Sequence, residues 1–357
     1  MTNRSAHPKL VYVTTGMSSF SRNDVALLER TYQVVPFVFA PRRKWLTPWV
    51  LVRQLLFLLR HQPHAAACVV QFGGYHSFLP ALLGSMIQVP VMIVLGGFDC
   101  ASFPSFHYGA HHRFPMGWVT RAAMRLATRL VAVSDNLVLS ESKYSLTEGD
   151  PRRQGYRAFG PSITTPCTVL AYGYNAERFK PNDLRKPRSF LTVAQMNSAN
   201  FHRKGVDLMF ALAERFPDCS FTLVGNSPSM RYDRVPPNVE LIGSVQYNEL
   251  PMIYAHHVFY LQLSIWEGFP SAPCEAMLCG CVPIVSNVAA LPEIIGDTGF
   301  VLQTRDIEVL TPLVDQALRS DVQDLSSKAR ERIIERYPEQ IRNRLVVLVM
   351  EMRNRKE

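Results

Sequence analysis

Two glutamates, Glu267 and Glu275, stand eight positions apart, with a glycine, two prolines and a serine among the residues between them. Glu267 follows a short apolar run at 258–263 that is typical of a buried parallel strand. Pro273 is tolerated only in the first turn of a helix, so we expect a helix to begin at about residue 271 or 272. One carboxylate therefore belongs to a loop at the end of a strand, and the other belongs to the first turns of the next helix.

This placement suits a ligand with hydroxyl groups on both sides of a phosphate. In open α/β sheets ligands bind at the carboxyl ends of the strands, where Glu267 is expected. Helical side chains lean toward the N-terminus, which turns Glu275 toward the same crevice. The N–H groups at the helix start attract a phosphate, whereas carboxylates accept hydrogen bonds from hydroxyls. Two polyols flanking a diphosphate describe a nucleotide sugar. The alternative is that both glutamates are solvated surface residues.

Apolar runs alternate with helical stretches along the chain, with helices expected at about 23–30 and 206–215. The expected strands are 9–14, 34–39, 68–72, 89–95 and 130–133, then 190–193, 220–224, 239–242, 258–263 and 281–286. This alternation is typical of a doubly wound parallel sheet, and it occurs once in each half of the chain.

The length of 357 residues indicates two domains. The polar segment 182–187 ends in a proline and is the predicted linker. We predict an acceptor-side domain at 1–182, a nucleotide-sugar domain at 183–337, and a C-terminal helix at about 338–355 that crosses back to the first domain. The fold class is α/β, with two Rossmann-like domains that face each other across a cleft.

Positive charge is concentrated in the first half. Residues 1–182 contain 19 Lys and Arg against 8 Asp and Glu, whereas the remaining residues contain 19 against 21. The segment from Arg42 to Arg53 combines cations with Trp45, Trp49 and an apolar continuation, a composition suited to lying on an anionic bilayer.

A second basic stretch has Arg121, Arg125 and Arg129 four residues apart, which predicts one stripe along a helix. Such a stripe is either part of a binding surface or a solvated helix face. No nucleic-acid-binding module or aromatic platform accompanies the charge, so nucleic acid is not an expected partner.

The composition, 47% hydrophobic and 19% charged, is that of an ordinary globular protein. No uncharged apolar run reaches eighteen residues, so no membrane-spanning helix is expected, and residues 1–8 lack the apolar core of a signal peptide. Seven scattered cysteines indicate a reducing, cytoplasmic setting, and the pair Cys279 and Cys281 lacks the spacing of a zinc site.

Several motifs, in this order and at these separations, resemble those of retaining glycosyltransferases of family 4, also called glycosyl transferases group 1, which have the GT-B fold. The matching stretches are 132–134, 173–181, 204–208, 223–225, 267–277, 280–286 and 291–295. The stretch 267–277 resembles the E-x7-E element of that family, and 204–208 resembles its Lys-Gly helix start.

The resemblance assigns roles to individual residues. It implies that Glu267 contacts hydroxyls of the transferred sugar, that Glu275 contacts the ribose, and that Lys204 contacts the diphosphate. It also implies that the main chain from Gly268 through Phe269 and Pro270 to Ser271 meets the sugar and phosphates. A placed cation stabilises a departing diphosphate, and the sequence contains no Asp-x-Asp pair. We therefore expect transfer without a metal, and no cofactor besides the nucleotide sugar substrate.

The chain departs from the family pattern at three places. Gln195 stands where an arginine is usual, and Arg203 is the candidate for the second cation. Gly16 stands alone where a glycine pair is common, although we still expect it near the donor, as we do Gly225. Asp99 is the polar residue nearest to the place where the family often has a histidine. It either orients the acceptor hydroxyl or caps the next segment.

We therefore predict a retaining glycosyltransferase that moves a sugar from a nucleotide diphosphate sugar to an acceptor hydroxyl, in polysaccharide or lipid-linked glycan biosynthesis. The expected catalytic residues are Lys204, Glu267 and Asp99. The donor would bind the second domain. The basic first half would face a saccharide or lipid-linked acceptor, with the protein cytoplasmic or peripheral on the inner face of the membrane. The alternatives are a nucleotide-sugar epimerase and a non-catalytic protein that only binds the nucleotide.

Overall fold

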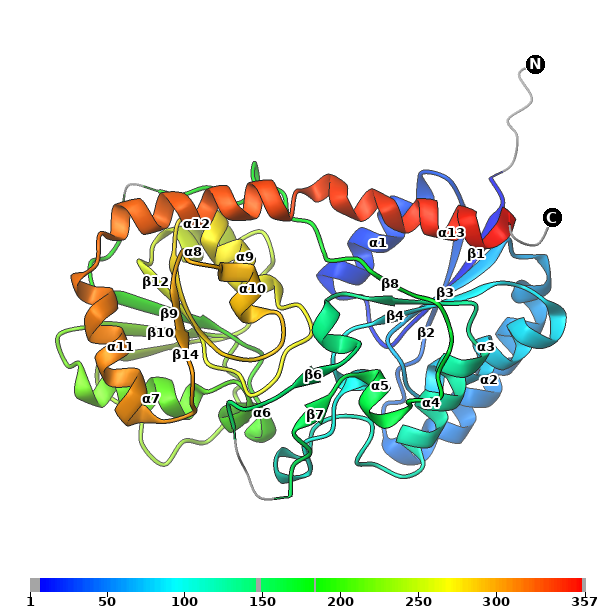
Figure 1. Cartoon of the computed structure of the whole chain (residues 1–357), viewed down its shortest axis with the longest axis horizontal. Coiled ribbons are helices and arrows are strands. Elements are labelled where there is room, and N and C mark those ends of the chain that lie inside the picture. Colours follow the sequence, from blue (N-terminus) through cyan, green and yellow to red (C-terminus); the bar gives the residue numbers. More distant parts are fainter. Residues whose placement is uncertain (1–6, 146–148, 183, 355–357) are drawn as a thin grey trace, which may run out of the picture.

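The computed structural model describes residues 7–145, 149–182 and 184–354. These residues form two six-stranded parallel sheets, with helices packed around each (Figure 1). In spatial order the first sheet consists of β2 (Gln33–Val38), β1 (Lys9–Thr14), β3 (Ala67–Gln71), β4 (Val91–Leu95), β5 (Arg129–Ala132) and β8 (Cys167–Val169). The second consists of β11 (Val239–Ile242), β10 (Ser220–Val224), β9 (Ser189–Val193), β12 (Phe259–Gln262), β13 (Val282–Ser286) and β14 (Phe300–Leu302).

Helices connect these strands in both halves. Those of the first half are α1 (Ser19–Glu29), α2 (Thr47–His61), α3 (Tyr75–Ile87), α4 (Met116–Leu126) and α5 (Tyr156–Phe159), with short 3-10 helices η1 (Lys44–Leu46), η2 (Gln62–His64), η3 (Phe98–Cys100), η4 (Pro104–Phe106) and η5 (Asp135–Leu137). A small antiparallel pair joins β6 (Ser140–Glu141) to β7 (Arg153–Gln154). Those of the second half are α6 (Ser198–Arg203), α7 (Val206–Arg215), α8 (Leu250–Ala255), α9 (Ser271–Leu278), α10 (Leu291–Ile295), α11 (Ile307–Arg319) and α12 (Val322–Arg336), followed by η6 (Glu339–Asn343) and α13 (Arg344–Asn354).

The predicted fold class, two doubly wound α/β domains, is confirmed. The strands at 220–224 and 239–242 and the helix at 206–215 have the predicted ends. The first helix begins at Ser19 rather than near residue 23, because the Ser18 hydroxyl accepts a hydrogen bond from the Ser21 N–H and caps the helix earlier. The division of the chain at residue 182 stays a prediction.

The C-terminal segment crosses from the second sheet to the first, along the top of Figure 1. It opens as the 3-10 helix η6, and α13 begins at Arg344. The predicted helix end at residue 355 and residue 183 of the predicted linker lie outside the described residues. A buried ion pair fixes the crossing, since the Arg342 guanidinium lies 2.7 Å from the Asp24 carboxylate of α1.

The prediction of one arginine stripe is wrong. Helix α4 ends at Leu126, and Arg129 opens β5, where it pairs with Met92 of β4. The Arg129 side chain is buried and donates to Thr168 Oγ1 at 2.9 Å. Pairing of β5 with its neighbour in the sheet outweighs the four-residue spacing, so only Arg121 and Arg125 share the helix.

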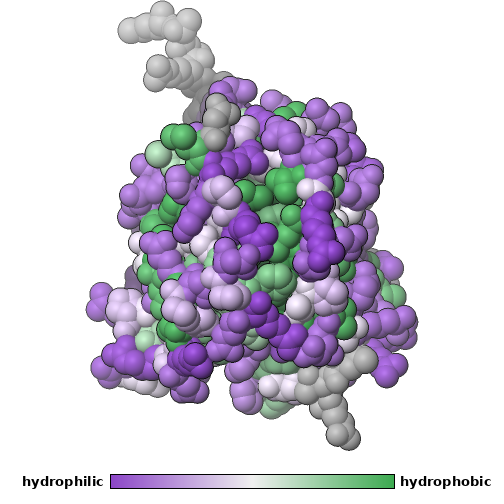
Figure 2. Space-filling model, turned by 90° about the vertical axis from the view of Figure 1, so that its left-hand side faces the viewer, coloured by the Kyte–Doolittle hydropathy of each residue, from purple (hydrophilic) through white to green (hydrophobic). Residues whose placement is uncertain are grey.

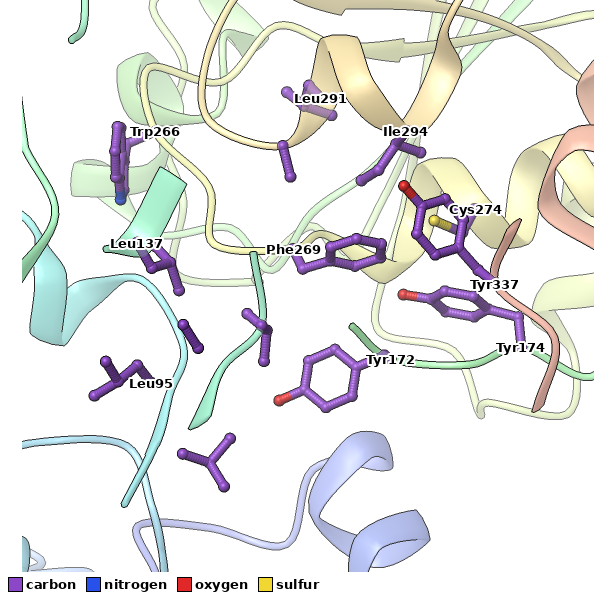
Figure 3. Packing of buried hydrophobic residues seen from close by; sticks show 14 of the residues in the cluster. Leu95, Leu137, Tyr172, Tyr174, Trp266, Phe269, Cys274, Leu291, Ile294 and Tyr337 are labelled. Carbon is purple, nitrogen blue, oxygen red and sulfur yellow. The ribbon is translucent and has the colours of Figure 1, made fainter. Parts of the chain in front are cut away.

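Aromatic side chains fill the junction between the two sheets (Figure 3). The Phe269 ring lies 6.4 Å from the Tyr174 ring and 5.0 Å from the Tyr337 ring, between centroids. Tyr172 belongs to the same hydrophobic cluster and packs on Phe20 of α1. Because rings from both halves and from the crossing segment pack together, the two sides of the junction are held against each other.

Candidate active site

A lysine and a glutamate form an ion pair at the carboxyl end of β12. Glu267 lies in the loop after this strand and is 9% exposed. Lys204 Nζ donates a hydrogen bond to Glu267 Oε1, and Gln262 Nε2 donates to the same oxygen at 3.0 Å. The Tyr260 hydroxyl holds the Gln262 amide at 2.9 Å. Both sequence-predicted residues are therefore brought together, and a buried polar network orients the carboxylate.

Lys204 reaches this place because a glycine follows it. Gly205 has φ +71°, and a Cβ atom there would lie 2.2 Å from the Leu263 carbonyl oxygen. A larger residue would push the α6–α7 connection away from the loop after β12. The Ile265 N–H also donates to the Arg203 carbonyl at 2.9 Å. The Lys-Gly pair thus places the ammonium group beside Glu267.

Burial and neighbouring charges shift the pKa of both members of the Lys204–Glu267 pair. Burial disfavours the Glu267 carboxylate, but the nearby charges of Lys204 and Arg203 outweigh it and hold the pKa of Glu267 below its usual value. Burial lowers the pKa of Lys204, which the charge of Glu267 opposes and that of Arg203 reinforces. A bound diphosphate would compete with Glu267 for the ammonium group and free the carboxylate to accept from hydroxyls.

Arg203 is fixed rather than free. Its Nε and Nη2 atoms donate to Asn200 Oδ1 at 3.0 and 2.8 Å, and its guanidinium lies 4.6 Å from the centroid of the Tyr108 ring. Tyr108 comes from the first half of the chain, so this cation–π contact spans the cleft. The guanidinium adds a second positive charge beside Glu267. Whether Arg203 replaces the arginine that is usual at position 195 stays a prediction.

The two halves also meet through backbone. A Cβ atom on Gly268 would lie 1.9 Å from the Gly96 carbonyl oxygen, and one on Gly97 would lie 3.0 Å from the Gly268 nitrogen. Ser134 Oγ donates to the Gly268 carbonyl at 3.1 Å. Only glycine permits this approach of the two loops, which joins the two halves next to Glu267.

Asp99 holds the loop that makes this contact. Its carboxylate accepts from the N–H groups of Gly73 at 2.8 Å, Gly97 at 2.9 Å and Gly96 at 3.1 Å. Burial raises the pKa of Asp99, and the three N–H groups oppose that rise. Asp99 thus ties the Gly96–Gly97 loop to Gly73, whereas among the described residues no side chain caps the following 3-10 helix η3.

Glu275 lies apart from Glu267. It is buried in α9 and accepts from the hydroxyls of Tyr247 at 3.0 Å and Tyr254 at 3.1 Å. Burial raises the pKa of Glu275 to about 7, although the two hydroxyls and Arg178 act against it. The alternative that both glutamates are solvated is wrong, since both are buried. The two carboxylates share no hydrogen-bond partner among the described residues, so the single crevice expected from the sequence is not formed by both of them.

A cavity of about 410 Å³ lies in front of Glu275, between α1 and α9. Asn23, Arg178 and Ser271 contribute to its lining. Helix α9 begins at Ser271, as predicted, with Pro270 as its N-cap. This cavity has polar groups of both signs and is large enough for part of a nucleotide.

The remaining predicted donor residues differ in how closely they are surrounded. Phe269 points into the aromatic junction in Figure 3 and offers only its backbone to a ligand. Gly225 follows β10, and a Cβ there would lie 2.4 Å from the Ala194 carbonyl oxygen. Gly16 follows β1 in open space, and a Cβ added to it would meet no atom within 4 Å. Gly16 thus lies in a loop with room for a ligand.

Four site residues were not predicted: Gln262, Tyr108, Tyr247 and Tyr254. Gln262 could have been found from the sequence, because it is a lone amide at the end of an otherwise apolar strand. The three tyrosines could not have been found from the sequence, because tyrosine is common in protein cores. Only the fold brings the Tyr247 and Tyr254 hydroxyls to Glu275 and the Tyr108 ring to Arg203.

Two features are absent from the described residues. Among residues 7–145, 149–182 and 184–354, no three or more His, Cys, Asp or Glu side chains gather as a metal site would require. In the same ranges no helix has both the length and the apolar character needed to span a bilayer.

Residues 175–340 match the family model described as glycosyl transferases group 1. This stretch, a little under half of the chain, contains Lys204, Glu267 and Glu275. The chain is 35% identical over 83 residues to O-antigen chain mannosyltransferase B of Escherichia coli, covering 23% of this chain and 22% of the relative. It is 29% identical over 143 residues to the phosphatidylinositol N-acetylglucosaminyltransferase gpi3 subunit of Schizosaccharomyces pombe, covering 36% and 30%. The chain thus spans less than a third of the length of these two relatives.

Solved structures match nearly the whole chain. Sucrose-phosphate synthase of Thermosynechococcus elongatus superposes with a TM-score of 0.73 at 14% identity, covering 98% of this chain and 100% of the other. Anabaena HepE in complex with UDP-glucose superposes with a TM-score of 0.68 at 13% identity, covering 97% and 100%. At such identities the likeness concerns the fold alone, and this fold is the GT-B fold of glycosyltransferases.

Proposed function

We propose that the protein is a retaining, metal-independent glycosyltransferase of the hexosyltransferase type that uses a nucleotide diphosphate sugar. One observation carries this proposal: the buried Lys204–Glu267 pair stands at the carboxyl end of β12, inside the stretch that matches group 1 glycosyltransferases. A cation and a hydroxyl acceptor in contact suit the diphosphate and the sugar of one ligand.

Each half of the donor has its own partners. Lys204 and Arg203 would face the diphosphate, and Glu267 would accept from the sugar hydroxyls. Glu275 would accept from the ribose in the adjacent cavity, after its bonds to Tyr247 and Tyr254 rearrange. The backbone of 268–271, together with Gly16 and Gly225, would line the path between the two glutamates. Solved HepE carries UDP-glucose in the same fold, which supports a donor of this class.

The transfer breaks the bond between the anomeric carbon and the diphosphate oxygen, which leaves with the electron pair. The acceptor oxygen attacks the same face of that carbon, and its proton passes to the departing diphosphate. Retention by this front-face route rests on the family resemblance. Lys204 would stabilise the charge on the leaving diphosphate, and Asp99 would act as a positioning residue by fixing the Gly96–Gly97 loop.

For the acceptor we propose a saccharide or lipid-linked glycan at the cytoplasmic face of a membrane. Two relatives are named for transfer to O-antigen chains and to phosphatidylinositol. The first half of the chain, which would face the acceptor, carries 19 Lys and Arg against 8 Asp and Glu, and this suits an anionic acceptor.

A panel of nucleotide sugars in a thermal-shift assay tests the donor, because a ligand that binds the native state raises the unfolding temperature. We expect one nucleotide sugar to stabilise the protein with EDTA present as strongly as without it. Incubation with that donor and an acceptor panel then tests transfer. Release of a new sugar or altered nucleotide sugar without any acceptor would identify an epimerase. Binding with neither transfer nor hydrolysis would identify a non-catalytic protein.

A further inference from the structure

Helix α2 carries a continuous exposed apolar stripe. Trp45 in η1 and Trp49, Leu56 and Leu59 on the helix recur at intervals of three, four or seven residues, so they lie on one face. Trp45 is 70% exposed, Trp49 64% and Leu56 63%, and Val52 completes the stripe between them. An exposed stripe of this size on a helix whose opposite face is packed marks an interaction surface.

The neighbouring helices of the first half carry further exposed aromatic side chains. Helix α3 packs against both α2 and α4, and the three lie together at the right-hand end of Figure 1. Phe114, in the loop before α4, is 92% exposed, and Trp118 on α4 is half exposed. We call the exposed side chains Trp45, Trp49, Val52, Leu56, Leu59, Phe114 and Trp118 the α2–α4 surface.

Cations predominate in the part of the sequence that contains the α2–α4 surface. Between residues 30 and 134 the sequence contains ten Lys and Arg, and its single acidic residue is Asp99. Asp99 is 1% exposed and bonded to backbone, so its charge does not reach this surface. Arg42, Arg43 and Lys44 are exposed directly before the stripe.

The second domain offers a comparison. Figure 2 shows the end of the molecule opposite α2, where hydrophilic side chains surround scattered apolar ones. Its exposed large apolar residues among those described, such as Met252, Val309 and Ile334, stand on three different helices and form no stripe. The apolar stripe and the excess of cations thus coincide at one end of the molecule.

We propose that the α2–α4 surface docks the protein on an anionic lipid bilayer. Tryptophan and leucine side chains would enter the interface, and the bordering cations would pair with the headgroups. A protein partner would not require the combination of exposed tryptophans with the cations Arg42, Arg43 and Lys44.

The docking surface continues into the candidate site. Phe114 follows Tyr108 by six residues in the sequence. The Tyr108 ring makes the cation–π contact with Arg203, whose guanidinium lies beside Glu267. Arg113 covers the Phe98 ring at 5.7 Å, and Phe98 contacts Tyr108 edge to face at 5.5 Å. Docking would therefore place lipid headgroups next to the loop that contains Tyr108, on the side of the site where the acceptor is expected. This last step rests on the proposed function, whereas bilayer binding does not.

Sedimentation with vesicles tests the docking. We expect the full chain to sediment with phosphatidylglycerol-containing vesicles, in a salt-dependent manner, and only weakly with pure phosphatidylcholine. The Arg42→Gln/Arg43→Gln/Lys44→Gln variant should bind about 100-fold more weakly. The Leu56→Ser/Leu59→Ser variant should bind about 10-fold more weakly. Met252→Ser/Ile334→Ser in the second domain is the matched control and should bind like the wild type.

The tryptophans provide an independent readout. Three of the four tryptophans, at positions 45, 49 and 118, belong to the α2–α4 surface, whereas Trp266 is buried. Brominated lipids should quench the wild type, and the Trp45→Phe/Trp49→Phe/Trp118→Phe variant should keep its emission. No wild-type binding to anionic vesicles, or equal loss in the control variant, would overturn the proposal. Light scattering that shows a dimer lost in Leu56→Ser would assign the surface to a second copy instead. Donor stabilisation in the thermal-shift assay is scored separately, so failure of docking leaves the proposed function standing.

Discussion

The two halves of the chain share an architecture and differ in where they place charge. Each has a six-stranded parallel sheet, but the family match covers residues 175–340 only. The candidate site of the second half contains the buried carboxylates Glu267 and Glu275 and the partly buried Lys204. The first half exposes its cations beside an apolar stripe. One fold can thus support a buried site for a small ligand in one domain and a surface for a large partner in the other.

The largest expected effect is on the buried site of the second half. Glu267→Ala removes the proposed sugar-hydroxyl acceptor and leaves Lys204 unpaired, so sugar transfer should fall by ~10²–10³-fold. Glu335→Ala, at an exposed position of α12, is the control and should leave the rate unchanged. Initial rates with a saturating donor measure both variants. Undiminished transfer by Glu267→Ala would remove this residue from the site.

The next effect concerns the segment that joins the halves. Arg342→Met leaves the buried Asp24 carboxylate without its partner, which should lower the free energy of unfolding by about 3–5 kcal/mol. Arg344→Met breaks only the exposed pair with Glu351 and should cost less than about 1 kcal/mol. Urea unfolding measures both. Adding Asp24→Asn to Arg342→Met should recover part of the loss, and no recovery would contradict the pairing argument.

The sequence predicts the strands and helices within each half better than the contacts that join the two halves. Apolar runs mark strands because parallel strands are buried on both faces, and the predicted strands 9–14 and 220–224 match the observed ones to the residue. The prediction for Arg129 is wrong because strand pairing, which is not local, outweighs helical spacing. The contact of Tyr108 with Arg203 joins residues far apart in the sequence, and no local pattern encodes it.

The separation of the two glutamates shows the same limit. Their spacing correctly predicts a loop and a helix start, since proline and glycine act locally. It does not predict that Glu275 turns to Tyr247 and Tyr254, because those hydroxyls come from a separate loop and helix.

A third test concerns the glycine contact between the loops of the two halves. Gly268→Ala places a methyl group 1.9 Å from the Gly96 carbonyl oxygen and should hold the halves apart. A displacement of about 1 Å at the site should reduce transfer by ~10²-fold. Gly243→Ala is the control, because the nearest atom to its added methyl group would be the Asn226 carbonyl oxygen at 4.0 Å, and it should leave the rate unchanged. Equal rates for the two variants would show that contact between the loops is not needed.

The smallest expected effect comes from substituting Glu275, and it is an increase rather than a decrease in the free energy of unfolding. Glu275 has its pKa raised from 4.5 to about 7 by burial, so the native state binds this proton more tightly than the unfolded state. Its contribution to stability is therefore full below pH 4.5 and is lost as the pH rises through about 7. Glu275→Gln removes the buried charge, keeps a polar group for the two tyrosines, and should stabilise the protein by up to about 3 kcal/mol at pH 8.

The same variant should show no such gain at pH 4.5, where the wild-type carboxyl is neutral in the native state. Unfolding free energies at the two pH values measure the difference, and an equal gain at both would contradict the titration argument. If Glu275 also binds the ribose, the stabilised variant should bind the donor more weakly. Higher stability together with weaker donor binding would mean that the second half keeps the buried Glu275 charge for ligand binding although it destabilises the fold. The exposed cations of the first half do not lower stability in this way.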